Sequence, residues 1–289
     1  MQLVSPNFAD ILPANFEIKN FPDGDSYIRI LDPEKYKGQQ VTFFHRLYPN
    51  QNDSITQALL VLGVLKKLKC EVTMVAPYLP YSRQDKTFHD GEAESAKIVC
   101  NLLAGAGVKK LVTFDCHFLK KEGEFKYGKL NLQNISLSKA IIDHAKEKFG
   151  NTDGAGTEVP FEIVSPDEGA NYLVEGAGGK SMKKVRGEYE TENKDEAYRT
   201  IESMERNFDV SGKNVLIIDD MISTGGTMVK AAENLKKGGA KKVGCATTHG
   251  FFLKDSLARL RGMCDFVFAS DTIPNEVSEV KIGDFVANL

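Results

Sequence analysis

The sequence predicts an α/β protein made of two tandem domains, each a mainly parallel sheet flanked by helices. Short apolar runs alternate with longer helical patterns along the chain, and this order is typical of parallel sheets. In addition, NLLAGAGVKKLVTFDCHF at 101–118 is echoed by NLKKGGAKKVGCATTHGF at 234–251. The offset between Lys109 and Lys241, and between His117 and His249, is 132 residues in both cases. A repeated offset indicates tandem copies of one α/β unit, although helix–Gly–strand turns can also coincide by chance.

The predicted elements follow from length and periodicity. Strands are expected in the short apolar runs, at Val41–His45, Val72–Ala76, Lys110–Asp115, Phe161–Ser165, Asn214–Asp219 and Lys242–Thr247. Helices are expected in the longer periodic segments, at Ile55–Lys69, Glu94–Ala106, Ser136–Phe149, Thr227–Lys237 and Lys254–Arg261. The polar, glycine-rich segment Gly150–Glu158 resembles a linker, which gives predicted domains at 1–149 and 150–289. The segment Gly176–Arg206 is glycine-rich and then densely charged, as functional or disordered loops are.

Composition narrows the function classes. Hydrophobic residues at 42% and charged residues at 27% are ordinary for a globular protein, and a net charge of -3 gives no reason to expect nucleic-acid binding. No apolar run reaches membrane-spanning length, and the N-terminus does not have the pattern of a signal peptide. The five cysteines show no Cys-x-x-Cys spacing and are expected as reduced thiols in a cytoplasmic protein.

The segment Val215–Thr227 (VLIIDDMISTGGT) is the strongest chemical signal. An apolar run that ends in Asp219 and Asp220 predicts a buried parallel strand that brings two carboxylates to the edge of a sheet. The turn that follows would present backbone N–H groups and hydroxyls at a helix N-terminus, which stabilises an anion. A sugar phosphate has both the neighbouring hydroxyls and the phosphate that such a site suits. A simple helix cap is the plainer interpretation. The P-loop and the dinucleotide fingerprint are excluded, since neither glycine pattern is present.

These residues resemble the ribose-phosphate motif of type I phosphoribosyltransferases. A second motif runs from Pro77 to Lys86 (PYLPYSRQDK), and GEAESAK at 91–97 and Asp115-Cys116-His117 follow it. Together the motifs resemble the ribose-phosphate pyrophosphokinases, also called phosphoribosyl pyrophosphate synthetases. The residues at 86–92 are most similar to the archaeal branch of that family. The resemblance covers the chain from about Phe21 to Phe252.

The resemblance implies a diphosphoryl transfer from ATP to the C1 hydroxyl of ribose 5-phosphate, with AMP as the second product. Asp219 and Asp220 would hold the ribose hydroxyls, and the 5-phosphate would be held by Ser223, Thr224, Gly225, Gly226 and Thr227. ATP would be bound by Phe21, Asp23, Asp25, Arg83, Gln84 and His117, with the Phe21–Asp25 turn often supplied by a neighbouring subunit. Asp25 stands where the family usually has Glu, and Phe88 where it often has an acid. From the residues alone, Phe21–Asp25 is also a plain β-turn and the 77–86 segment a solvated loop.

The resemblance also implies a magnesium ion bound by His117 and Asp167, and catalysis by a Lys-x-Arg pair on a flexible segment. Lys184 and Arg186 match that spacing, and Lys183 would match it only with a shift in register. Without the resemblance, His117 could be a structural histidine, Asp167 a helix N-cap and the basic run a solvated surface. A cation pair on a closing loop suits diphosphoryl transfer, which needs positioning, charge neutralisation and exclusion of water.

The predicted function is therefore that of a ribose-phosphate diphosphokinase, a homo-oligomer with the ATP site near a subunit interface. Two alternatives remain: a phosphoribosyltransferase that acts on a nucleobase, and a non-catalytic regulator that senses the diphosphorylated sugar. The first leaves the Arg-Gln-Asp loop at 83–85 unexplained, and the second would be expected to lose the Lys-x-Arg pair or the metal residues. The sequence decides neither the number of subunits, nor allosteric control, nor nucleotide preference, nor a role for 188–206.

Overall fold

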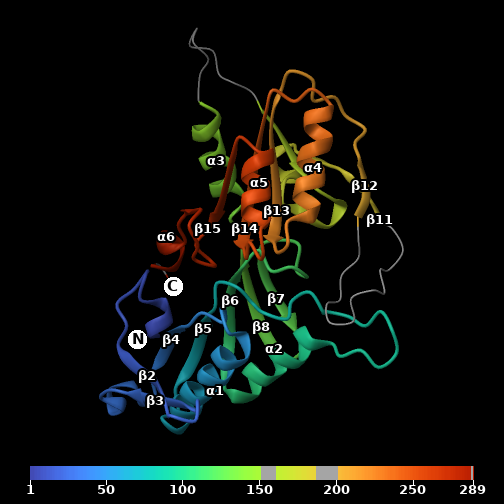
Figure 1. Ribbon diagram of the computed structural model, residues 1–289. Helices are drawn as coiled ribbons and strands as arrows, with labels where there is room; N and C mark the ends of the chain where they lie inside the picture. Colours follow the sequence, from blue (N-terminus) through green and yellow to red (C-terminus); the bar gives the residue numbers. More distant parts are fainter. Residues whose placement is uncertain (151–160, 187–200, 288) are drawn as a thin grey trace. The chain divides into compact units, whose positions relative to one another are not determined.

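The computed structural model describes residues 1–150, 161–186, 201–287 and 289, with the side chains of 184–186 and 201–203 left out. The chain forms two compact units, one of residues 1–135 and 282–289 and the other of residues 136–281 (Figure 1). This division falls earlier in the chain than the expected boundary at 149/150, and it returns the C-terminal residues to the first unit.

The first unit is built on a six-stranded sheet in the order β1-β4-β5-β6-β8-β7. Its strands are β1 (Gln2–Val4), β4 (Gln40–Phe44), β5 (Glu71–Val75), β6 (Val108–Phe114), β7 (Gly123–Tyr127) and β8 (Leu130–Ile135). All neighbouring pairs are parallel except β7 and β8, which form an antiparallel hairpin. Because the strands are parallel, their carboxyl ends meet at one edge, where the loops at 76–94 and 115–122 begin.

Helices and a second hairpin surround this sheet. Helix α1 (Gln51–Lys67) and helix α2 (Ser95–Ala106) bury one apolar stripe each against it, in a core that includes Leu62, Leu65 and Leu103. The antiparallel strands β2 (Phe16–Asn20) and β3 (Ser26–Ile30) make a separate two-stranded sheet that contacts α1. Short 3-10 helices lie at Pro6–Phe8 and Pro33–Tyr36, and α6 (Gly283–Val286) closes the unit.

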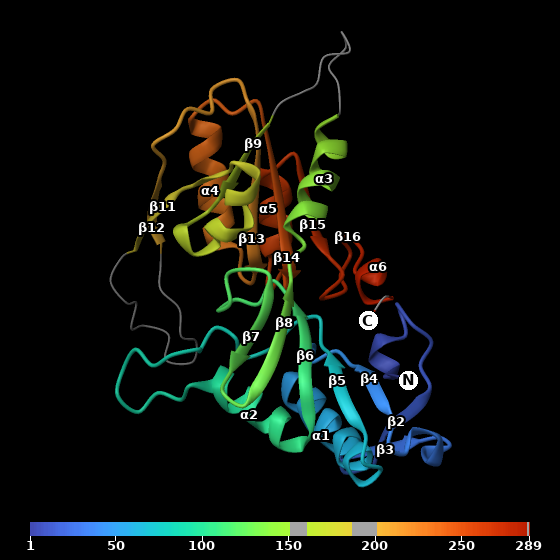
Figure 2. The ribbon, with the colours of Figure 1, turned by 180° about the vertical axis from the view of Figure 1, so that it is seen from behind.

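The second unit has an entirely parallel six-stranded sheet in the order β10-β9-β13-β14-β15-β16. Its strands are β9 (Phe161–Ser165), β10 (Lys180–Ser181), β13 (Asn214–Ile222), β14 (Lys242–Gly250), β15 (Phe266–Ser270) and β16 (Ser278–Val280). Helices α3 (Ser138–Phe149), α4 (Gly226–Lys237) and α5 (Ser256–Met263) flank it, as Figure 2 shows from behind. Two 3-10 helices, Glu168–Leu173 and Glu175–Ala177, follow β9, and β11 (Lys183–Arg186) pairs with β12 (Ile201–Glu205) as an antiparallel ribbon.

The predicted α/β architecture of two mainly parallel sheets is confirmed, with corrections to particular elements. The predicted strand Asn214–Asp219 is too short, because pairing with β14 continues through Met221 and Ile222 and places both aspartates inside β13. Helix α1 begins at Gln51, four residues before the predicted start at Ile55. The strands β1, β2, β3, β7, β8 and β16, which are short or amphipathic, were not predicted, and neither was β15, a largely buried and apolar run of five residues. The predicted linker falls largely within 151–160, outside the described residues.

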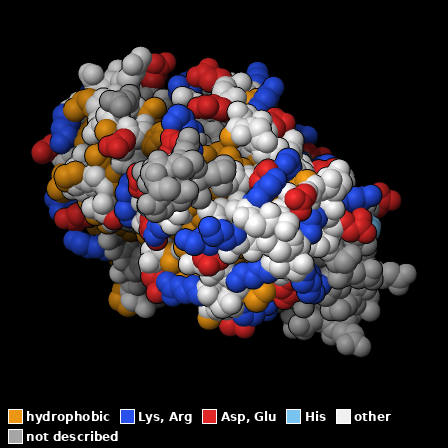
Figure 3. All heavy atoms as spheres, turned by 90° about the horizontal axis from the view of Figure 1, so that it is seen from above, with side chains coloured by type: hydrophobic (Ala, Val, Ile, Leu, Met, Phe, Trp, Pro, Cys, Tyr) orange, Lys and Arg blue, Asp and Glu red, His pale blue; other side chains and the backbone are white. Residues whose placement is uncertain are grey.

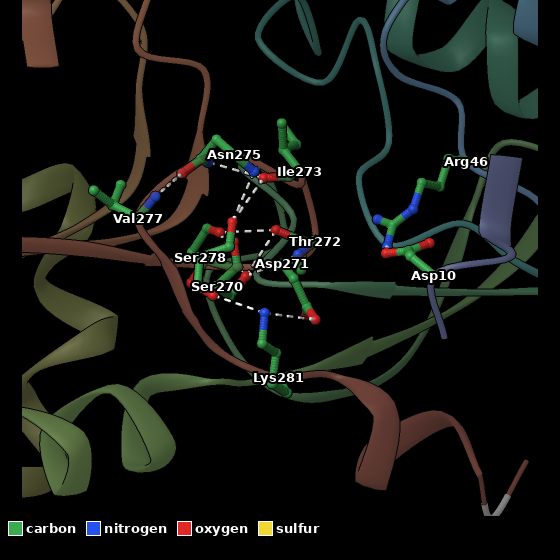
Figure 4. A network of polar contacts seen from close by, with 11 residues as sticks. Asp10, Arg46, Ser270, Asp271, Thr272, Ile273, Asn275, Val277, Ser278 and Lys281 are labelled. Atoms are coloured by element: carbon green, nitrogen blue, oxygen red, sulfur yellow. Dashed lines mark hydrogen bonds and ion pairs between the residues drawn. The ribbon is translucent and has the colours of Figure 1, made fainter. Parts of the chain in front are cut away.

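A partly buried polar network orders the chain after β15. Figure 4 shows Ser270, Asn275 and Ser278 joined there, and the Lys281 ammonium reaches the Ser278 carbonyl at 2.7 Å. In the first unit, the buried guanidinium of Arg46 pairs with Asp10 at 2.8 Å.

On the face seen in Figure 3, basic and acidic side chains are interspersed, in keeping with the small net charge. Among the described residues, no helix combines the length and the apolar character needed to cross a bilayer.

Candidate active site

The predicted sugar-phosphate loop joins β13 to α4. The chain turns at Gly225, whose φ of 72° lies in the left-handed region that favours glycine, and the first hydrogen bond of α4 runs from Val229 N to Gly225 O at 2.9 Å. At an α-helix N-terminus the first N–H groups are not used by the helix's own backbone hydrogen bonds, and such an end attracts an anion. Residues 223–227, with the predicted Ser223, Thr224 and Thr227 hydroxyls, form the turn at this helix end and are called the backbone cradle below.

Two carboxylates stand at the entrance to this loop. Asp220 is buried and Asp219 is half-buried, and the Asp220 N–H donates to Asp219 Oδ1 at 3.0 Å. Burial raises the pKa of Asp219 well above its ordinary value, and repulsion from Asp220 and Asp167 adds to the rise. A hydrogen bond between the two carboxyl groups acts in the same direction. The two groups thus behave as a coupled pair that holds a proton more tightly than a free aspartate, and hydroxyl or cationic ligands would relieve their repulsion.

Asp167 belongs to the same group of acids. It follows β9 directly, and its Oδ1 accepts the Gly169 N–H at 2.8 Å, so it caps the 3-10 helix that begins at Glu168. The plain cap interpretation is therefore correct for its local structure. Its repulsion of Asp219 nevertheless places its charge beside the pair, because β9 and β13 are neighbours in the sheet. The second unit thus gathers three carboxylates at the carboxyl edge of its sheet.

In the first unit, the Arg83 region lines a cavity. Gln51, Asn52, Tyr78, Tyr81 and Arg83 surround a hollow of about 280 Å³. The Tyr81 hydroxyl donates to the Asn52 side chain, and Tyr81 has a φ of 64°, a conformation that costs free energy for a residue with a side chain. The predicted nucleotide residue Arg83 is exposed at this hollow, and Gln84 follows it. The cavity lies at the carboxyl edge of the first sheet, where ligands of parallel sheets bind.

Glu92 organises the loop after Arg83, a role that sequence reasoning missed. Its Oε2 accepts the backbone N–H groups of Phe88 at 2.7 Å and His89 at 3.2 Å, and the side-chain amide of Gln84 at 3.2 Å. The Phe88 N–H is the largest cause that lowers the pKa of this carboxyl. The sequence motif contains Gly91-Glu92, but only the folded loop indicates which groups the Glu92 carboxylate contacts. Backbone donors thus hold the loop in place, and the side-chain amide of Gln84 is partly occupied by its hydrogen bond to Glu92.

The remaining nucleotide residues occupy separate places. His117 is half-buried directly after β6, where the Asn134 side chain accepts the Cys116 N–H at 2.8 Å and fixes the turn. Phe21 lies at the tip of the β2–β3 hairpin, is 52% exposed and meets Tyr27 edge to face at 5.8 Å. The tip is a turn in which Asp23 Oδ1 accepts the Asp25 N–H at 3.1 Å. In Figures 1 and 2 the hairpin lies on the β4 side of the first unit, whereas the 84–92 loop extends on the β7 side.

The predicted catalytic pair lies on the two-stranded ribbon. Lys184 pairs with Met204 and Arg186 with Ile201 in the backbone register of β11 and β12. The side chains of Lys184 and Arg186 are outside the described part of the structure, as is the charged segment 187–200. Lys183, which would match the catalytic lysine only with a shift in register, is exposed and pairs with Glu205 in the same ribbon.

Comparison with known proteins agrees with this arrangement. Residues 7–107 match the N-terminal domain of ribose phosphate pyrophosphokinase, and residues 158–280 match the phosphoribosyl transferase domain. The ribose-phosphate pyrophosphokinase of Pyrococcus furiosus is 38% identical over 95% of this chain and 92% of its own length. That of Sulfurisphaera tokodaii is 36% identical over 93% of this chain and 88% of its own length.

A solved structure shows the same fold. The crystal structure of phosphoribosylpyrophosphate synthetase from Mycobacterium smegmatis superposes with a TM-score of 0.77 at 23% identity, covering 100% of this chain and 96% of that one. Two sheets of this type, two matching domains and full-length relatives at more than a third identity lead to one conclusion. The chain belongs to the ribose-phosphate pyrophosphokinase family, with archaeal members among its similar relatives.

Proposed function

We propose that this protein is an enzyme that transfers the diphosphoryl group of ATP to the C1 hydroxyl of ribose 5-phosphate, giving 5-phosphoribosyl 1-diphosphate and AMP. The observation that carries the proposal is the coupled pair of aspartates beside the cradle of backbone donors, at the carboxyl end of a buried parallel strand. The pair suits two neighbouring ribose hydroxyls, which can donate to its oxygens, and the cradle suits the 5-phosphate. Family membership supports the donor and the reaction.

In this reaction the C1 oxygen attacks the β-phosphorus of ATP. The bond from that phosphorus to the oxygen bridging the α- and β-phosphates breaks, AMP leaves with the bonding electrons, and the hydroxyl proton passes to solvent. Asp219, Asp220 and residues 223–227 hold the acceptor still, which supplies much of the advantage in such transfers. Lys184 and Arg186 are proposed to neutralise the charge that develops on the moving group, and Arg83 and Gln84 to hold the nucleotide.

Magnesium is the proposed metal, and the described residues fit it in part. The negative charges of Asp220 and Asp167 both act on Asp219 and favour a bound cation, and the half-buried Asp167 has oxygen ligands of the kind that magnesium prefers. Within the described ranges, no set of three or more His, Cys, Asp and Glu side chains is arranged as a complete metal site. Magnesium often takes one or two protein ligands and completes its shell with substrate phosphates and water. When bound, it would neutralise phosphate charge; His117 is proposed as the second contact, on the nucleotide side.

The test is AMP release from ATP. We expect release that requires both ribose 5-phosphate and Mg²⁺, with a diphosphorylated sugar formed in equal amount. A matched pair of variants links the activity to the site: Asp220→Asn should abolish it, whereas Asp209→Asn, an exposed acid of the same unit, should not. AMP formed without ribose 5-phosphate, or consumption of the diphosphorylated sugar only with a nucleobase, would contradict the proposal.

We further propose that the active enzyme is a homo-oligomer in which the Phe21 hairpin completes the ATP site of another subunit. The exposed aromatic ring of Phe21 and the acids beside it support an intermolecular role. Phe21→Ala and Arg83→Ala should each be inactive alone, and mixed oligomers should recover activity because some sites then contain neither substitution. Mixtures that stay inactive, with exchange of subunits verified, would contradict the shared site.

We also expect a cytoplasmic protein, since its five cysteines are free thiols.

A further inference from the structure

The turn that bears the sugar-phosphate cradle is held from behind by the α5 region. The Ser223 carbonyl accepts the Leu253 N–H at 3.0 Å and the Ser256 hydroxyl at 3.3 Å. The next carbonyl, that of Thr224, accepts Arg259 Nη2 at 2.6 Å. Two consecutive carbonyls of the loop are thus directed at one helix that begins about thirty residues later in the chain.

These bonds decide where the amides point. A trans peptide unit is planar, and its C=O and N–H groups point in opposite directions. Both peptide bonds here are trans, so a Ser223 carbonyl turned toward α5 directs the Thr224 N–H away from α5. In the same way, a Thr224 carbonyl held by Arg259 directs the Gly225 N–H away from that helix. The carbonyl contacts thus fix the direction of both N–H groups, away from α5, before any ligand arrives.

Packing keeps the helix in contact with the turn. A Cβ atom placed on Gly225 would lie 3.0 Å from Ser256 Cβ and 3.6 Å from a Leu260 methyl group. The turn and the first part of α5 are therefore as close as a residue without a side chain allows. A change in the position of α5 would be transmitted to the turn, because no space separates them.

The guanidinium contributes charge as well as shape. Arg259 is 43% exposed, and its Nε pairs with Asp255 at 3.1 Å, so the planar group is oriented by its own helix. A hydrogen bond from a cation is stronger than one from a neutral donor, and it polarises the peptide that accepts it. The Gly225 N–H on the same peptide becomes a better donor to an anion.

We propose that Arg259, with a smaller contribution from Ser256, is a positioning residue that presets the Thr224 and Gly225 amides for the phosphate of the sugar substrate. The inference rests on the proposed function for the identity of that ligand. It adds a specific element to the site: ribose 5-phosphate affinity should depend on a side chain that touches the loop from behind, while nucleotide affinity should not.

The experiment compares Arg259→Ala, Arg259→Lys and Ser256→Ala with Arg261→Ala in the full-length protein. Arg261 is the matched control: it lies on the same helix, is 50% exposed and pairs with Glu276 at 3.2 Å. Calorimetry gives the Kd for ribose 5-phosphate and for ATP, each alone, and steady-state kinetics gives KM for both with kcat. For Arg259→Ala we expect the ribose 5-phosphate Kd and KM to rise about tenfold, with ATP values within about twofold. Ser256→Ala should cost about threefold, since the Leu253 N–H still holds the same carbonyl.

Arg259→Lys should recover part of the loss, because an ammonium can still reach the Thr224 carbonyl but cannot also keep the contact that Nε makes with Asp255. Equal behaviour of Arg259→Ala and Arg261→Ala would overturn the inference while leaving the function intact. So would a loss of affinity equal for ATP and ribose 5-phosphate, which indicates general damage. A wild-type protein that binds no ribose 5-phosphate would instead overturn the proposed function, and this inference with it.

Discussion

Replacing Gly225 by alanine tests the geometry of the cradle most directly. The residue has a φ of 72°, and an alanine in that conformation costs roughly 1–2 kcal/mol. The added Cβ would also stand 3.0 Å from Ser256 Cβ, so the turn or α5 must move by a few tenths of an ångström. Against this, alanine restricts the unfolded chain and returns about 0.4–1 kcal/mol. The net loss is about 1 kcal/mol, equivalent to a fall in Tm of roughly 2–4 °C.

The functional loss should exceed the loss of stability. Displacement of the turn re-aims several N–H donors at once, so we expect ribose 5-phosphate affinity to fall by about tenfold or more. Calorimetric unfolding and ligand titration measure the two effects. Gly226→Ala is the control, since that residue lacks a positive φ and a Cβ there meets nothing within 4 Å, so its Tm should be unchanged or higher. Adding Ser256→Gly to Gly225→Ala should restore part of the Tm by making room.

A Gly225→Ala protein with unchanged Tm and unchanged ribose 5-phosphate affinity would refute this reasoning. It would mean either that the turn does not adopt the left-handed conformation in solution or that α5 does not press against it.

Three further predictions concern charge. Lys184→Ala should lower kcat by about 10³ and leave ribose 5-phosphate binding nearly intact, and equal losses in both would argue against a catalytic role. Burial lowers the pKa of His45 to about 4, so the stability that its neutral form contributes is full above about pH 6.5 and lost as pH falls toward 4. Urea unfolding at pH 7 and pH 4.5 should show about 2.4 kcal/mol of this loss in wild type and little of it in His45→Gln. The pKa of Asp219 is raised, so its ionisation removes stability as pH rises above the ordinary aspartate value. Asp219→Asn should therefore raise the Tm of the unliganded protein at pH 7 while abolishing ribose 5-phosphate binding, whereas Glu205→Gln should do neither.

Much of the fold could be predicted from the sequence, because the signals for these strands and helices lie within the segments themselves. Strands such as Phe161–Ser165 are short apolar runs, and helix α4 ends at Lys237 as its pattern and the following glycines indicate. The hairpin strands β2 and β3 were missed since they are only partly buried, and a strand of that kind gains its partner from a turn and from α1. The end of β13 was predicted too early because its last residues are held by pairing with His249 and Gly250.

The candidate site also has a part that the sequence predicts and a part that only the fold shows. The sequence indicated Asp219, Asp220 and the turn after them, because one continuous motif contains all of these groups. No local pattern linked Asp167 to that pair, or Glu92 to the backbone of its own loop. The contact from Arg259 had no signal at all, since a basic residue on an exposed helix usually faces water.

The sequence by itself determined which chemical groups this protein has and in which segments they lie: two acids, a glycine turn, a Lys-x-Arg pair and two alternating α/β halves. Tertiary structure alone decided which of those groups meet. Strand order brings β9 beside β13 and thereby Asp167 beside Asp219, and the crossover after β14 brings α5 against the turn at Gly225. The physical reason is that a parallel sheet joins strands distant in the chain, so contacts at its carboxyl edge depend on packing of the whole unit.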